Sequence, residues 1–163
     1  FNPIVVSVSL IVGGIILIFI DKKVVNTETK VLEVEDISYK NAFFIGLFQC
    51  LSMVPGTSRA AATIIGGVFN GLDKKQATEF SFLLAVPTMI AASGYDLLKT
   101  DLVFTNNQLS LLGIGTAVAF ITAWFAVKVF IQFVSKNGFT VFGYYRIIIG
   151  ILFLIFMWGT DLG

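Results

Sequence analysis

Residues 54–64, VPGTSRAAATI, decide the fold: a Pro-Gly pair is followed by two hydroxyls and an arginine inside a very apolar chain. The Pro-Gly pair predicts the end of one helix, and Thr57 or Ser58 can cap the next. A charge in a span-forming region costs roughly 2.5–3.5 kcal/mol, so Arg59 is a functional-site candidate. Hydroxyls, free helix N–H groups and a guanidinium then converge on one point. This pattern predicts an anion site, and phosphate suits it best.

The composition is that of an integral membrane protein. The chain has 163 residues, 56% of them hydrophobic and 13% charged, and its mean hydropathy is +0.91. Such a chain lacks the charge that covers a soluble domain. A net charge of +1 without a basic aromatic patch argues against a nucleic-acid partner. The chain has no histidine and a single cysteine, Cys50, so histidine chemistry, disulfides and thiolate metal clusters are excluded within it.

Hydropathy divides the chain into spans and one hydrophilic connector. Residues 3–20 carry no charge and are long enough for a first span, and nine of the 21 charged residues fall in 21–40, which we interpret as a solvated loop. Three later segments are also long enough to span: 76–98, weakened or kinked at Pro87, then 109–134 and 140–159. The predicted class is an all-α, polytopic membrane protein.

Between the connector and the later spans lie two short apolar pieces, 41–54 and 58–71. Each reaches only about 21 Å as a helix, against a hydrocarbon core of roughly 30 Å. We therefore predict a re-entrant hairpin over 41–71 within a single transmembrane domain, 1–163. The hairpin returns to the side that it leaves, which puts the basic loops 21–40, 72–75 and 135–139 together on the cytoplasmic side.

Each candidate residue also has a structural interpretation. Arg59 can bond carbonyl groups at the helix break, and Thr57 and Ser58 can be caps and nothing more. Thr63 lies at i+4 from Arg59 and faces the same pocket, unless its hydroxyl bonds the carbonyl one turn back. Gln49, on the preceding short helix, is a pocket wall or an interhelical hydrogen-bonding group. The sequence leaves these alternatives open.

Arg146, in FGYYRIIIG, is about two turns into the last span. For this residue we favour snorkelling to the cytoplasmic interface, or binding of a lipid head group, over a catalytic role.

Together these segments resemble the undecaprenyl-diphosphate phosphatases, the bacitracin-resistance proteins of bacterial plasma membranes. The resemblance rests on the motifs GLFQC at 46–50, PGTSR at 55–59, ATI at 62–64, EFSFLL at 79–84, and Tyr145-Arg146 with Gly150. The family hydrolyses undecaprenyl diphosphate to the monophosphate lipid carrier of peptidoglycan synthesis. The resemblance implies a multi-pass protein of the inner membrane and a fold of inverted repeats with broken helices near midplane.

By this resemblance, Arg59 and Ser58 are the catalytic residues. Arg59 would clamp the diphosphate, Ser58 and Thr63 would hydrogen-bond its oxygens, and Thr57 and Gln49 would complete substrate binding. The family usually has Ser-Gly where this chain has Ala60-Ala61. A divalent cation, Mg²⁺ or Ca²⁺, is also implied, although this sequence shows no carboxylate cluster that holds one alone.

The chain looks like the C-terminal half of such a protein. The first-half motif, two glutamates four apart followed by Ser-Ser/Thr-x-x-His, is missing here. The isolated chain is therefore expected to be inactive. Its expected partners are the isoprenoid lipid diphosphate, membrane lipids, the missing N-terminal half and a second copy in a homodimer. The alternative function is half of a secondary transporter or a lipid flippase, because these also use broken helices with a midplane anion site.

Overall fold

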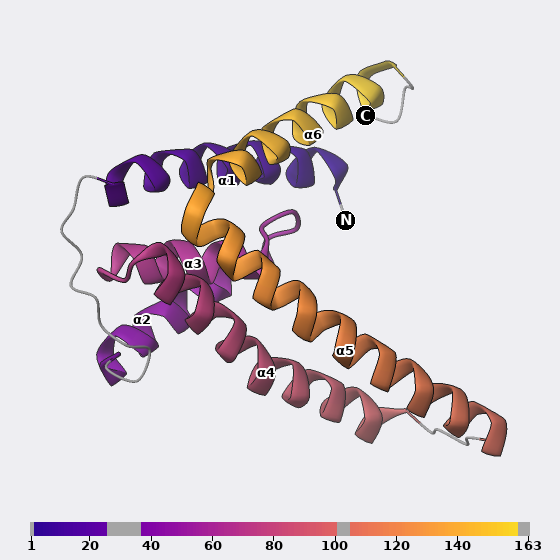
Figure 1. The fold of residues 1–163 in the computed structure, drawn as a ribbon. Helices are drawn as coiled ribbons and strands as arrows, with labels where there is room; N and C mark the ends of the chain where they lie inside the picture. Colours follow the sequence, from indigo (N-terminus) through magenta and orange to yellow (C-terminus); the bar gives the residue numbers. More distant parts are fainter. Residues whose placement is uncertain (1, 26–36, 101–104, 160–163) are drawn as a thin grey trace.

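A computed structural model describes residues 2–25, 37–100 and 105–159, and all the regular structure in these ranges is helical (Figure 1). The elements in chain order are α1 (Pro3–Val25), α2 (Tyr39–Cys50), a 3₁₀ turn η2 (Leu51–Met53), α3 (Arg59–Phe69), α4 (Lys74–Lys99), α5 (Asn106–Asn137) and α6 (Thr140–Gly159). Four of them, α1, α4, α5 and α6, are long and apolar enough to cross a membrane. The predicted class, an all-α polytopic membrane protein, is confirmed.

The first and last helices, α1 and α6, lie side by side although they are far apart in the sequence (Figure 1). Small residues let their backbones approach. A Cβ on Gly14 would lie 2.6 Å from the carbonyl oxygen of Gly143, and a Cβ on Gly150 would lie 2.9 Å from that of Ser7. Close approach of this kind is how membrane helices gain packing contacts where lipid is as apolar as the side chains. The pair forms a rigid support for the elements beneath it.

The short helices α2 and α3 form the predicted helical hairpin around the Pro-Gly break. They pack against each other: the side chain of Phe48 lies over Gly66, and its ring stacks on that of Phe69 with centroids 6.0 Å apart. Helix α3 also buries Ile64 against Leu72 and Ala77 at the start of α4. The two short helices and their break are confirmed. Their return to one membrane face, and the single-domain organisation, stay predictions.

Helices α4 and α5 run together away from the other helices (Figure 1). Each begins with a capping box, Asp73 with Gln76 and Thr105 with Gln108. Helix α4 continues through Pro87 without ending. Most large apolar side chains on this arm are exposed, as lipid-facing side chains are in a membrane span.

One charge expected in a solvated loop is buried instead. Asp21 is 7% exposed, and its carboxylate lies 2.6 Å from the Lys74 ammonium while accepting hydrogen bonds from the backbone N–H and hydroxyl of Thr140. The same carboxylate occupies the space where a Cβ on Gly138 would lie. The loop prediction is therefore wrong for Asp21, which ties α1 to the starts of α4 and α6. The predicted loop is also too long at both ends, since α1 continues to Val25 and α2 begins at Tyr39, and residues 26–36 lie outside the described residues.

The hairpin prediction is tested by labelling from each membrane face. In a Cys50→Ala background, Lys40→Cys in the first turn of α2 and Lys75→Cys in the first turn of α4 are both at exposed positions. An impermeant maleimide should reach both from the same face because a 12-residue and an 11-residue helix are too short to cross. Lys99→Cys, at the far end of α4, is the control and should label from the opposite face. Labelling of positions 40 and 75 from opposite faces would show that the hairpin crosses the membrane.

Candidate functional site

The candidate site is the break between η2 and α3. A β-turn forms it: the N–H of Thr57 donates to the carbonyl of Val54 at 3.0 Å, with Pro55 and Gly56 between them. Gly56 has φ of 89°, a left-handed value that follows proline in a type II turn. A Cβ at Gly56 would lie 2.6 Å from the carbonyl oxygen of Val6. Glycine is therefore required twice, for the turn itself and for its contact with the backbone of α1.

Ser58 starts α3 directly after the turn. Its extended backbone and its Oγ, which accepts from the N–H of Ala61 at 3.3 Å, make it the N-cap. Of the two predicted caps, the structure selects Ser58. Helix starts leave their first N–H groups without intrahelical partners, so those of Arg59 and Ala60 remain available to a ligand. Such N–H groups, at the positive end of the helix dipole, suit an anion.

Arg59 is half-buried at the first position of α3. Its Nη1 is buried and has no hydrogen-bond partner, and no carboxylate of the described residues lies within ion-pairing distance. The structural alternative, an arginine bonded to carbonyl groups at the break, is therefore not what the described residues show. A buried guanidinium nitrogen without a partner is costly, and an anion at this position would satisfy it.

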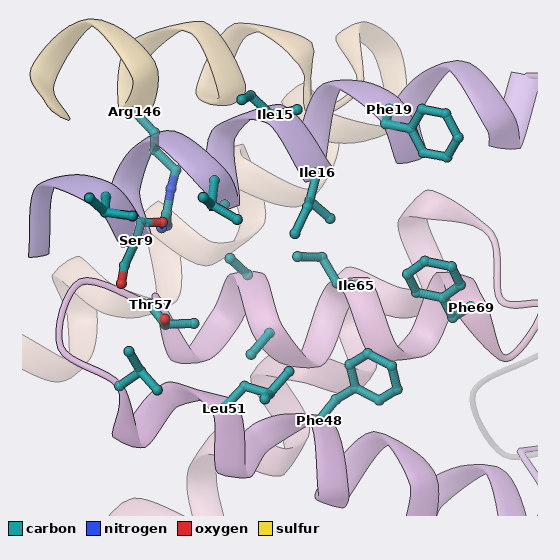
Figure 2. Close-up of a pocket in the computed structure, with 16 residues that line it drawn as sticks. Ser9, Ile15, Ile16, Phe19, Phe48, Leu51, Thr57, Ile65, Phe69 and Arg146 are labelled. Atoms are coloured by element: carbon teal, nitrogen blue, oxygen red, sulfur yellow. The ribbon is translucent and has the colours of Figure 1, made fainter. Parts of the chain in front are cut away.

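A different arginine bonds the break. Arg146 extends from α6 past α1 toward the turn (Figure 2), and its Nη2 donates to the carbonyl of Gly56 at 2.9 Å and to that of Ser9 at 3.5 Å. Its side chain is buried, and its Nε has no partner. The prediction that Arg146 snorkels to the interface is wrong. The sequence shows Arg146 as a charge within an apolar span but does not identify its acceptors, which lie 90 and 137 residues away.

The other predicted residues have different surroundings. Thr63 is buried and turned toward α4: its hydroxyl lies 2.6 Å from that of Ser81 and donates to the carbonyls of Arg59 and Ala60. This is the backbone-bonded alternative, with an interhelical bond added. Gln49 is half-buried, and its Oε1 is buried without a partner. The break thus places Thr57, Ser58 and Arg59 at consecutive positions at the start of α3, whereas Thr63 faces α4.

An apolar cavity of about 550 Å³ lies beside the break, between α1 and the α2–α3 hairpin (Figure 2). Most of its walls are aliphatic and aromatic, with Phe19, Phe48 and Phe69 toward one end. Thr57 and Arg146 line it at the turn. Arg146 also lines a second cavity of about 360 Å³, together with Ser58 and Tyr145, and Arg59 lines neither of these two cavities. An elongated apolar space that ends at polar groups fits an amphipathic ligand.

Carboxylates do not gather at this site. Among the residues that the structure describes, no three His, Cys, Asp or Glu side chains are close enough together to bind one metal ion. Glu79 forms an ion pair with Lys75 at 3.7 Å on α4, and Asp21 pairs with Lys74. These residues by themselves do not form a divalent-cation site.

The fold defines a polytopic membrane protein with a helix pair broken by a Pro-Gly turn. The family model described as bacitracin resistance protein BacA matches residues 1–152, and the chain belongs to this family. The undecaprenyl-diphosphatase of Wolinella succinogenes is 50% identical over 157 residues, 96% of this chain and 61% of that protein. That of Persephonella marina is 50% identical over 96% of this chain and 62% of the relative, and undecaprenyl-diphosphatase 3 of Acinetobacter baylyi is 45% identical over 96% and 58%.

These alignments correct one expectation about extent. The chain spans about three fifths of the length of the curated relatives that it matches, and nearly all of the chain takes part. The expectation that the chain corresponds to one half of a family member is therefore wrong, because the matched part is longer than half.

Two glycine variants separate turn geometry from close packing at the site. Gly56 and Gly71 have nearly the same φ, 89° and 88°, but a Cβ meets the backbone of α1 only at Gly56. Gly71→Ala should cost about 1–3 kcal/mol, the price of a left-handed non-glycine residue. Gly56→Ala should cost clearly more, because the turn must also move away from α1. Thermal unfolding of the two variants in detergent measures the difference. Equal losses would contradict the close contact between the turn and α1.

Proposed function

We propose that the protein containing this chain hydrolyses undecaprenyl diphosphate to undecaprenyl phosphate and inorganic phosphate in the bacterial inner membrane. The observation that carries the proposal is the unpaired, buried Nη1 of Arg59 at the capped N-terminus of α3. The names of the relatives, all undecaprenyl-diphosphatases, support the same reaction. They favour hydrolysis over the alternative of a transporter or flippase half.

Arg59 binds the diphosphate in this proposal. A guanidinium presents paired N–H groups that match two phosphate oxygens, and the N–H groups of the first turn of α3 lie beside it. Thr57 and Ser58 contribute hydroxyls at the same end of the helix, although the Oγ of Ser58 already accepts from Ala61. Gln49 is a further proposed substrate contact, because its Oε1 is buried without a partner. Thr63 acts on the substrate only by holding α3 against Ser81.

The lipid end of the substrate enters the apolar cavity beside the break. The cavity places aliphatic and aromatic walls next to Thr57 and Arg146. A prenyl diphosphate has the same division, with an apolar chain directly attached to a charged head. The first isoprene units occupy the cavity, and the rest of the chain stays in the bilayer.

Hydrolysis forms a bond from the attacking oxygen to the terminal phosphorus and breaks that phosphorus's bond to the bridging oxygen. The leaving group is the prenyl monophosphate. Catalysis of phosphoryl transfer is mostly positioning and charge neutralisation, and Arg59 with the N-terminus of α3 supplies both. This chain has no histidine, and two of its described carboxylates, those of Asp21 and Glu79, pair with lysines. The group that activates the attacking oxygen is therefore proposed to come from outside this chain, and the isolated chain to lack turnover.

A divalent cation, Mg²⁺ or Ca²⁺, is part of the proposal only because the resemblance to the family implies one. The described residues do not fit one, since they offer no group of three ligating side chains. We derive no step through it; its protein ligands would come from beyond the described residues. An N-terminal portion of the same protein is a proposed partner, and a homodimer is proposed as the assembled form.

The test is substitution of Arg59 in the full-length protein. Arg59→Ala removes both charge and paired donors, and Arg59→Lys keeps the charge without the planar fork. Loss of a desolvated contact to the transferred phosphoryl group lowers kcat by about 10²–10³-fold, with little change in KM, if the contact acts in the transition state. The kcat of Arg59→Lys should lie between that of the parent and that of Arg59→Ala, or close to that of Arg59→Ala. The control, Lys136→Ala, removes an exposed cation at the end of α5. Phosphate release and membrane abundance are measured together.

A structural arginine gives the opposite pattern. The abundance of Arg59→Ala would then fall, while the surviving protein keeps near-normal specific activity. That result would remove Arg59 from the substrate site.

A further inference from the structure

We infer that Arg146 is a positioning residue of this site: it holds the Pro-Gly turn against α1 and thereby fixes Ser58 and Arg59 at the start of α3. The effect on turnover rests on the proposed function, while the effect on the turn does not. The geometry assigns this role because one buried side chain, from the far end of the sequence, connects α6, α1 and the turn.

The first step is the bond itself. The turn takes the Gly56 carbonyl out of any helix, and a membrane interior supplies no water to bond it. The Arg146 Nη2 donates to this oxygen at 2.9 Å, a charge-assisted hydrogen bond of the stronger kind. The carbonyl of Ser9, at 3.5 Å, is a second and longer acceptor on α1. The same nitrogen thus contacts the turn and the helix against which the turn packs.

The second step is the space made for the side chain. A Cβ on Gly13 would lie 2.7 Å from the Arg146 Nη2, so α1 has no side chain where the guanidinium passes. The base of Arg146 is equally fixed, because α6 contacts α1 through Gly14 and Gly143. The Arg146 side chain therefore starts from the closely packed α1–α6 pair and extends toward the turn (Figure 2).

The third step leads to the reaction. Gly56 is three residues before Arg59, and Ser58 between them caps α3. A turn that loosens moves the N-terminus of α3 and the Arg59 guanidinium together. Misplacement of a substrate-positioning group by about 1 Å lowers the rate by up to about 10²-fold, even when the mutation that causes it lies far from the reacting atoms. Since its Nη2 is committed to protein carbonyls, Arg146 acts on the substrate through the turn.

Hydrogen exchange and kinetics of the full-length protein test this role. Arg146→Lys shortens the donor and removes the planar fork, and Gly13→Ala pushes the guanidinium aside from α1 without removing it. Both should speed exchange at the amides of Thr57, Ala61 and Ala62, which bond within the turn and cap. Both should also lower kcat by about 10–100-fold, more than they raise KM. Exchange in α4 and α5 should stay at the parent rate.

Ile147→Ala is the matched control, because its side chain packs beside Gly14 in the same helix pair and does not contact the turn. It should leave exchange at the turn unchanged. The inference is overturned if neither variant speeds exchange at the turn, or if Ile147→Ala speeds it equally. Faster exchange with unchanged kcat would support the role of Arg146 in holding the turn and would contradict the proposed phosphate site at the start of α3. A rise in KM alone, with parent exchange, would instead make Arg146 a direct substrate contact.

Discussion

The structure depends on how the Pro-Gly break satisfies its backbone. Where the turn interrupts the helix, the Gly56 carbonyl has no helical partner. The partner is Arg146, 90 residues later in sequence. The Arg146 side chain reaches the turn only because α6 lies against α1, and Gly14, Gly143 and Gly150 permit this close packing. A second polar tie, between Asp21, Lys74 and Thr140, joins α1 to the starts of α4 and α6.

The guanidinium groups of Arg59 and Arg146, both near the turn, differ in their hydrogen-bond partners. Arg146 is bonded to protein carbonyls, so its charge is partly compensated inside the protein. Each arginine has one buried nitrogen without a partner among the described residues, Nη1 of Arg59 and Nε of Arg146, but only Arg146 also donates to protein carbonyls. Desolvated charge is costly unless paired, and the helix N-terminus adds positive potential at the same point. This difference supports the proposals that Arg59 binds the phosphate and that Arg146 holds the turn.

Local sequence patterns were enough for the parts of the fold that depend on local physics. Chain length, apolar runs and breakers gave the spans, and the last helix has the predicted bounds, Thr140–Gly159. The hairpin and the Ser58 cap follow from Pro-Gly and a hydroxyl. Asp21 and Arg146 could not be placed, because their partners come from other helices: Asp21 meets Lys74 and Thr140, and Arg146 meets acceptors 90 and 137 residues away. Thr63 shows the same limit: position i+4 placed it on the face of Arg59, but its bond to Ser81 on α4 required the packing.

The most direct test of the account is a structure of the full-length protein with a non-hydrolysable prenyl methylene-diphosphonate. The account predicts diphosphonate oxygens within hydrogen-bonding distance of the Arg59 guanidinium and of the first N–H groups of α3. The prenyl chain should lie in the cavity between α1 and α3, and Arg146 should remain on the Gly56 carbonyl. A diphosphonate bound elsewhere, with Arg59 paired to a protein carboxylate, would contradict the assignment of the break as the phosphate site.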